Sequence, residues 1–197
     1  MASIIQDMGS HFIFDAGPLI TLCKFQVQGQ PAIDLILEAC DITIPAAVQA
    51  EVVIAGSRYP DAKVAQERLV ARRIQVATSA ADASLAEILA LYNFGDGERE
   101  AISLAIEWEN RGTVLVVDDH LAYLICDRLR APKIFLLDLV AQLCRDKHLG
   151  FEIGVDLINA IASRYPKAFV QHTLLLLKWQ EGREEKCSGT LCGTFPW

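Results

Sequence analysis

Short apolar runs alternate with longer helical patterns along most of this chain, and this alternation is the feature that most restricts its fold. The runs are HFIFD (11–15), DITI (41–44), IQVA (74–77), TVLVVDD (113–119) and KIFLL (133–137). Between them, apolar residues recur at helical spacing, bounded by Gly and Pro. Strands that alternate with helices form a mostly parallel sheet covered on both faces. We therefore predict an α/β fold.

The helical patterns extend past the last predicted strand. We expect helices after Pro18, over 31–39, from 46, over 58–73, 82–92, 97–112, 120–129, 138–148 and 152–163. A further segment, AFVQHTLLLLKWQEG (168–182), contains more large apolar residues than a small surface helix needs. Three partners are candidates for covering it: a second copy of the chain (a homodimer), an antitoxin-like protein, or the rest of the same chain.

Composition limits the class of protein. The 197 residues, 52% hydrophobic and 22% charged, suit one globular domain with a short extension. No apolar run approaches the roughly 18 residues that span a bilayer, and no basic stretch precedes a hydrophobic one at the N-terminus. We expect a cytoplasmic protein without membrane contact. Of the six cysteines, only Cys187 and Cys192 lie close enough in sequence to form a disulfide or supply two zinc ligands, and no second ligand pair accompanies them.

Acidic residues stand at the carboxyl ends of two predicted strands. Asp15 ends the first strand, and Asp118 and Asp119 end the run TVLVV. In open parallel sheets the ligand crevice lies at the carboxyl ends of the strands, beside the point where strand order reverses. We therefore expect these three carboxylates to face one crevice.

Two helical acids are positioned to reach the same crevice. Glu51 lies three residues after Val48, and Glu98 lies four before Ile102, so both fall on the inward sides of their helices. Close carboxylates repel by about 4 kcal/mol per pair at an intermediate dielectric, and no basic residue is patterned to offset them. An all-oxygen ligand set favours Mg²⁺ or Mn²⁺ over zinc or copper.

Several of these acids also have a structural interpretation. Asp15, Asp96 and Asp119 each precede a predicted helix and are candidates for capping it. Glu51 is not at a helix end, which favours a role in a site. Glu100, Glu107 and Glu109 fall toward the polar face of their helix, where we expect solvation.

The net charge argues against binding nucleic acid through bulk electrostatics, because the chain carries −7 at pH 7. Two divalent cations would offset about four of these units. Local clusters at Arg68, Arg72 and Arg73, or at Arg128, Arg130 and Lys133, could then contact phosphates, or could simply be solvated helix faces.

Four segments in this order resemble those of the PIN-domain ribonucleases, in particular the prokaryotic branch that includes VapC-like toxins. They are FDAGPLI (14–20), PAAVQAE (45–51), GDGEREAISLA (95–105) and VLVVDDHLA (114–122), within residues 11 to about 149. The resemblance implies a three-layer α/β/α fold with about five strands ordered 3-2-1-4-5, and Mg²⁺- or Mn²⁺-dependent hydrolysis of RNA. We expect a nuclease domain over 1–150 and a C-terminal helical extension over 151–197.

The resemblance also implies roles for single residues. Asp15, Glu51 and Glu98 match the first three acidic positions, and Asp118 or Asp119 matches the fourth. Gly17 stands where the family often has Ser or Thr, so that hydroxyl is missing. The family's fourth motif often has Thr two residues before its Asp; here Val117 occupies that place.

These observations predict a metal-dependent ribonuclease with five candidate catalytic and metal-binding residues: Asp15, Glu51, Glu98, Asp118 and Asp119. A toxin paired with an antitoxin is one form of this function. The rival is a catalytically silent PIN-like module that binds RNA or a protein. His120, where the family commonly has Arg or Lys, is either a phosphate contact or incidental. An aspartyl phosphatase is disfavoured because it needs a second acid at position 17, and a receiver-like domain because its paired acids should follow the first strand.

Overall fold

Five parallel strands form the central sheet of the computed structural model, which describes residues 11–56, 58–80 and 82–189. They are β1 (His11–Phe14), β4 (Asp41–Pro45), β5 (Ile74–Ala77), β6 (Val114–Val116) and β7 (Lys133–Ile134). The sheet has the order β5-β4-β1-β6-β7, and every neighbouring pair is parallel. Counted along the chain, this is 3-2-1-4-5, so the predicted strand order is confirmed.

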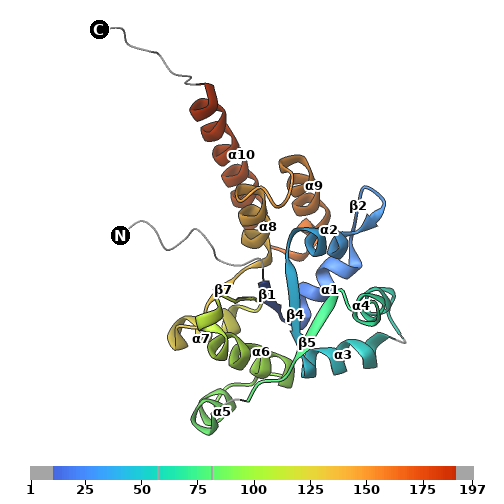
Figure 1. The fold of residues 1–197 in the computed structure, drawn as a ribbon, viewed down its shortest axis with the longest axis vertical. Helices are drawn as coiled ribbons and strands as arrows, with labels where there is room; N and C mark the ends of the chain where they lie inside the picture. The colour runs from blue at the N-terminus through green and yellow to red at the C-terminus, as the bar shows by residue number, and fades with distance from the viewer. Residues whose placement is uncertain (1–10, 57, 81, 190–197) are drawn as a thin grey trace.

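Helices cover the two faces of this sheet and give three layers (Figure 1). On one face lie α1 (Ala16–Lys24), α2 (Ala32–Ala39), α3 (Ala46–Gly56), α4 (Pro60–Val70), α8 (Leu136–Arg145), α9 (Phe151–Ile161) and α10 (Lys167–Gly189). On the other lie α5 (Ala83–Ala90), α6 (Asp96–Glu107) and α7 (His120–Leu129). The predicted α/β class is confirmed.

The central strands send side chains alternately into the two cores. In β1, Phe12 and Phe14 join one buried cluster while Ile13 joins the other, and Leu115 of β6 lies beside Ile13. Both faces of these strands are buried, which explains why they appear in the sequence as continuous apolar runs rather than alternating ones.

A small antiparallel hairpin was not predicted. It pairs β2 (Gln26–Val27) with β3 (Gln30–Pro31) through a two-residue turn in which Gln28 and Gly29 have φ of 50° and 85°. Positive φ at both central positions is typical of the type I′ turn. The Gln28 side chain donates a hydrogen bond to Asp156 at 3.0 Å, which connects the hairpin to α9.

The C-terminal helices pack on α8 and close one side of the fold. A short 3-10 turn, η2 (Ala162–Arg164), joins α9 to α10, and both helices contact α8. Leu157, Ile161 and Leu177 bury their side chains in the same cluster as the helices around β1. No helix among the described residues is long and apolar enough to cross a membrane. The Cys187 and Cys192 pair lies outside the residues whose side chains are described.

Candidate active site

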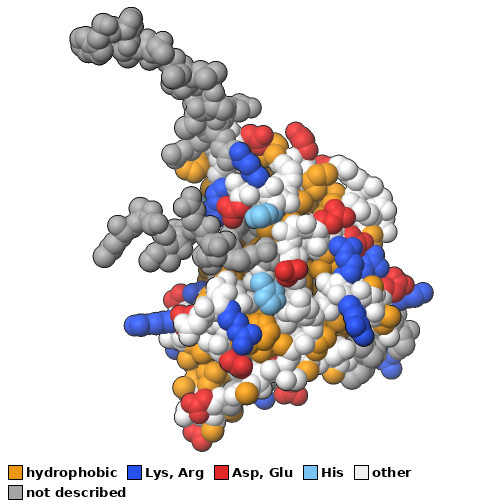
Figure 2. Space-filling view, viewed as in Figure 1, with side chains coloured by type: hydrophobic (Ala, Val, Ile, Leu, Met, Phe, Trp, Pro, Cys, Tyr) orange, Lys and Arg blue, Asp and Glu red, His pale blue; other side chains and the backbone are white. Residues whose placement is uncertain are grey.

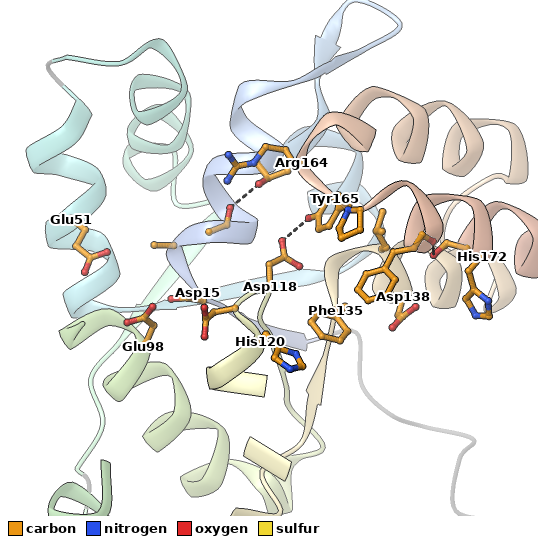
Figure 3. Close-up of a pocket in the computed structure, with 18 residues that line it drawn as sticks. Asp15, Glu51, Glu98, Asp118, His120, Phe135, Asp138, Arg164, Tyr165 and His172 are labelled. Atoms are coloured by element: carbon orange, nitrogen blue, oxygen red, sulfur yellow. Dashed lines mark hydrogen bonds between the residues drawn. The ribbon is translucent and has the colours of Figure 1, made fainter. Parts of the chain in front are cut away.

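A cavity of about 850 Å³ opens at the carboxyl ends of β1 and β6, where the sequence predicts a crevice. All five predicted site residues line it: Asp15, Glu51, Glu98, Asp118 and Asp119. They come from four separate segments of the chain, as Figure 3 shows for the labelled members. Helices and strands of the sheet scaffold, rather than long loops, therefore hold the acids.

The parallel pairing of β1 with β6 brings the strand-end acids together. Asp15 directly follows β1, and its backbone N–H donates to the carbonyl of Val116, the last residue of β6, at 3.2 Å. Val117 is buried and its amide bonds to Ile134 of β7. The chain therefore leaves the sheet at Asp118, beside Asp15, at the edge that forms the cavity floor.

Two glycines make room for the helix acids. A Cβ placed on Gly95 would lie 3.1 Å from Glu98 Oε2 and 3.9 Å from Glu51 Oε1, so both carboxylates lie near that backbone. A Cβ on Gly97 would lie 3.0 Å from Val48 Cγ2 and 3.1 Å from Glu51 Oε1. A side chain at position 97 would therefore require Val48 or Glu51 to shift by a few tenths of an ångström.

Burial makes the Asp15 carboxyl unusually hard to ionise. Only 6% of the residue is exposed. Desolvation, together with the nearby Glu98 and Glu51 carboxylates, raises its pKa to about 6, although the amides of Ala16 and Gly17 oppose the shift. The pKa of Glu51 is also raised, first by desolvation and then by Glu98. Burial also raises the pKa of Asp118, so three of the five acids have a raised pKa, as is common at functional sites.

No ion pair neutralises these acids within the described part of the chain, although the charge of Arg164 partly offsets the rise in the pKa of Asp118. None of the five takes part in an ion pair there. The carboxylates surround the cavity rather than touching, and among the described residues no three acidic, His or Cys side chains are grouped tightly enough to hold one ion as they stand. The all-oxygen donor set, the burial of Asp15 within it and the absence of an ion pair to these acids among the described residues fit a hard divalent cation such as Mg²⁺ or Mn²⁺, although Glu51 and Asp119 are exposed.

The adjacent acids Asp118 and Asp119 differ in their hydrogen bonds. Asp118 accepts the backbone N–H of Leu136 at 3.2 Å through Oδ1 and the hydroxyl of Tyr165 at 2.5 Å through Oδ2. Asp119 caps α7, because its Oδ1 accepts the N–H of Ala122 at 2.8 Å. Asp118 is therefore fixed through both oxygens, whereas Oδ2 of Asp119 makes no hydrogen bond to the described residues.

The other capping interpretations give mixed results. Asp15 precedes α1 without a capping hydrogen bond from its side chain, although the backbone N–H groups of Ala16 and Gly17 are close enough to lower its pKa. At α6 the N-cap is Gly95 rather than Asp96, and Glu98 accepts the Gly95 N–H at 2.5 Å. Asp96 instead lies 3.6 Å from Arg99. The Asp15 side chain is therefore not used as a helix cap, whereas one oxygen of Glu98 accepts the Gly95 N–H at the start of α6.

The expectation that Glu100 and Glu107 are simply solvated is wrong. Glu100 accepts the backbone N–H groups of Ala47 at 2.7 Å and Ser79 at 3.3 Å, and Glu107 accepts the N–H of Ala80 at 3.1 Å. These side chains replace backbone partners at the start of α3 and in the segment before α5. Their role is to join α6 to its neighbours.

The sequence leaves two interpretations for the basic clusters, phosphate contacts or solvated helix faces, and neither cluster lies at the acids. Arg68 lies 2.7 Å from Asp34, Lys133 lies 2.5 Å from Asp127, and neither cluster lines the cavity. On the face of the molecule shown in Figure 2, basic and acidic side chains are interspersed without a basic patch. Arg164 is the one arginine or lysine among the described residues that line the cavity.

Residues after 160 also line the cavity, and sequence reasoning missed them. They are Arg164, Tyr165, Pro166, Phe169, His172 and Thr173. The available signal was the run RYPKAF (164–169), in which basic and aromatic residues interrupt two apolar helices. This run lies outside the residues that carried the family resemblance, so nothing in the sequence connected it with the acids.

Comparison with known proteins identifies the family. A family model described as a PIN domain matches residues 11–175. A search of curated proteins and a search of solved structures found no match. PIN domains are generally nucleases that depend on divalent metals, which indicates a nuclease-type function and contact with nucleic acid. The match covers most of the chain and includes all five acids, and the chain belongs to the PIN-domain family.

Proposed function

We propose that this protein is a Mg²⁺- or Mn²⁺-dependent endoribonuclease that hydrolyses RNA phosphodiester bonds. One observation carries the proposal: five acids from four segments line one cavity, and no cationic side chain among the described residues pairs with them. Such a cluster is unfavourable unless cations compensate it.

The hydrogen bonds suggest different roles for the individual acids. Asp15 lies deepest and is positioned to bind or bridge cations, with Glu51 and Glu98 completing their shells directly or through water. The free Oδ2 of Asp119 makes it the better candidate for the fourth ligand, while Asp118 holds the surrounding structure in place. A bound divalent cation would supply a nucleophilic water at neutral pH and stabilise charge on the phosphate oxygens. No histidine or lysine base is then required.

The first test is Asp15→Asn, which keeps the shape of the side chain and removes its charge. We expect loss of Mn²⁺-dependent cleavage of single-stranded RNA by at least about 100-fold, and weaker Mn²⁺ binding by calorimetry. Asp127→Asn, which removes an exposed acid of α7 outside the cavity, is the matched control and should keep both properties. Cleavage by Asp15→Asn at the parent rate would refute the assignment.

The same assay distinguishes the two adjacent acids. Asp119→Asn should weaken Mn²⁺ binding directly. Asp118→Asn should weaken binding less and should mainly lower the thermal stability, because both of its oxygens accept hydrogen bonds from the protein. The reverse pattern would assign the ligand role to Asp118.

A toxin function is a narrower form of the proposal. Expression of the wild-type chain should then arrest bacterial growth, Asp15→Asn should not, and an antitoxin-like protein should restore growth. The exposed side chains of Leu175 and Trp179 on α10 are candidates for contact with such a partner or with a second copy of the chain.

A catalytically silent module is the second candidate. It is favoured by Gly17 and Val117, which lack the hydroxyls often found at these positions in the family, and by the absence of a tight three-ligand group among the described residues. In that case, RNA or protein binding would survive Asp15→Asn unchanged, and the wild-type chain would show no Mn²⁺-dependent cleavage.

A further inference from the structure

The cavity is much larger than a metal site requires. Its volume of about 850 Å³ lies in the range of sites that enclose a whole organic ligand. The predicted acids surround one end, and Figure 3 shows Phe135, Tyr165 and His172 extending the lining away from Asp15. Space beyond the acids is therefore available for a group attached to the scissile phosphate.

The second half of this cavity is formed by the segment from η2 to the start of α10, which we call the C-terminal wall (residues 164–173). Tyr165 fixes it to the acid cluster through its 2.5 Å hydrogen bond to Asp118. Val170 and Thr173 are buried, with 7% and 2% exposure, so this end of α10 is packed against the protein. The C-terminal wall is therefore held in place as part of the cavity lining.

Two side chains of the C-terminal wall remain accessible to a ligand. Phe169 is 56% exposed although it lines the cavity next to buried Val170. Arg164 forms no ion pair with any described residue, although its charge lowers the pKa of Asp118, and it is the single guanidinium in the lining. An exposed aromatic ring and an unpaired arginine in one cavity suit a ligand that has both a flat apolar face and an anionic group.

A third side chain adds a second aromatic surface. Phe135, at the end of β7, lines the cavity and stacks on Tyr123 with ring centroids 4.1 Å apart and an interplanar angle of 2°. This contact holds the Phe135 ring in one orientation at the boundary between the acids and the C-terminal wall. The lining thus contains a second phenylalanine ring besides Phe169.

We propose that the C-terminal wall is a nucleotide-binding subsite, in which Phe169 stacks on one base of a single-stranded RNA and Arg164 binds an adjacent phosphate. The inference rests on the proposed ribonuclease function, because the acids at the other end of the cavity would then act on the neighbouring phosphodiester. Stacking recognises any base, since every base has a π-face, so this subsite favours unpaired RNA without selecting its sequence. A duplex would have to unstack a base to use it.

The test measures binding rather than turnover. In the full-length Asp15→Asn protein with Mn²⁺, the dissociation constant of a fluorescent oligoadenylate is measured by anisotropy. Adding Phe169→Ala should weaken binding by about 5- to 100-fold, the range known for the loss of one base–aromatic stack. Phe169→Trp should retain binding. Leu175→Ala removes an exposed apolar side chain of the same helix outside the cavity and should have no effect.

Arg164 is tested through salt dependence. Arg164→Gln should weaken binding and reduce the slope of log affinity against log salt by about 0.7, the value for one phosphate contact on a single strand. Lys167→Gln removes a charge three residues away that does not line the cavity, and it should leave the slope nearly unchanged. Equal effects of the two variants would overturn the assignment of Arg164.

An oligonucleotide that lacks its bases separates stacking from general packing. Phe169→Ala should have no effect on its binding, and an equal loss for both oligonucleotides would overturn the stacking role. An unchanged affinity for oligoadenylate in Phe169→Ala, or no binding of RNA by the Asp15→Asn parent, would overturn the subsite. RNA cleavage by Asp15→Asn would instead refute the proposed acid roles and leave the binding comparison valid.

Discussion

Asp15 combines burial with a lack of compensating charge. Its carboxyl group is 6% exposed and lies near the Glu51 and Glu98 carboxylates. Each property disfavours the ionised form in the metal-free protein. The residue that the family resemblance places first among the ligands is therefore also one that reduces folding stability when no cation is bound.

The stability of the metal-free protein should reflect the Asp15 carboxyl. Because its pKa is about 6 in the folded chain and 3.8 in the unfolded chain, the folded state holds more protons between about pH 4 and 6. The contribution of Asp15 to the free energy of unfolding therefore falls as pH rises through this range. Asp15→Asn should be about 1 to 3 kcal/mol more stable than wild type at pH 7 and nearly equal to it at pH 4, by denaturant unfolding in EDTA. A difference independent of pH would contradict this.

At Gly17 the chain lacks the hydroxyl that the family often has near its first aspartate, and a substitution could restore it. Nothing lies within 4 Å of a Cβ at this position, so a side chain fits without displacing its neighbours. Gly17→Ser should strengthen Mn²⁺ binding several-fold by placing a hydroxyl beside the acids, with little change in melting temperature. Gly17→Ala adds the same carbon without oxygen and is the control. Equal metal affinity in the two variants would show that the hydroxyl is not used.

At the scale of helices, one charged pair joins α4 to α2. Arg68 donates through Nε and Nη2 to the two oxygens of Asp34 at 2.9 and 2.7 Å, with 20% and 15% of the two side chains exposed. Paired, charge-assisted hydrogen bonds of this geometry are stronger than ordinary surface ion pairs. The contact joins α4 to α2, while α4 also packs on α1 and α3.

Breaking this pair should destabilise the protein measurably. Asp34→Asn should lower the free energy of unfolding by about 1 to 2 kcal/mol at pH 7. Arg68 lowers the pKa of Asp34, so this stabilisation is present above the unfolded-state pKa and disappears as pH falls through the lower folded-state value. Glu67→Gln alters a more exposed partner of the same arginine and should change stability by less than about 0.5 kcal/mol. Equal effects would contradict the argument.

The main strands could be predicted because their signal is local, whereas the hairpin could not. A buried strand such as TVLVV is a continuous apolar run, but β2 and β3 have two residues each, too few for any periodicity. The only signal was Gly29 with Pro31 after it, typical of a turn in general. Glu100 was misjudged because its partners, Ala47 and Ser79, lie 53 and 21 residues away and donate backbone groups that the sequence does not display.

At the scale of the molecule, the acids could be predicted and the rest of the cavity could not. Asp15 and Asp118 were located from strand ends, because parallel strands align their carboxyl ends at one edge. The contact of Tyr165 with Asp118 spans 47 residues and depends on how α9 and α10 fold back over α8, which helical periodicity does not specify. Periodicity predicts which side of a helix is buried, but not which helix covers it.

The same packing predicts the result of shortening the chain. A version ending at residue 150 would lose the buried contacts of Leu157, Ile158 and Ile161, together with the Tyr165 hydroxyl that Asp118 accepts. It should melt at a lower temperature than the full chain and bind a hydrophobic dye such as ANS through the uncovered face of α8. Removal of residues 190–197 is the control. A shortened protein with unchanged melting behaviour would show that residues 1–150 fold independently.

The Tyr165–Asp118 hydrogen bond links the proposed site to a helix at the surface of the molecule. If the C-terminal wall binds substrate as proposed, a macromolecule that binds α10 and displaces it from α8 would widen the cavity and break the hydrogen bond between Tyr165 and Asp118 at the same time. Such an inhibitor would not need to contact the proposed metal ligands, because the helix whose displacement would disturb the site is accessible at the surface.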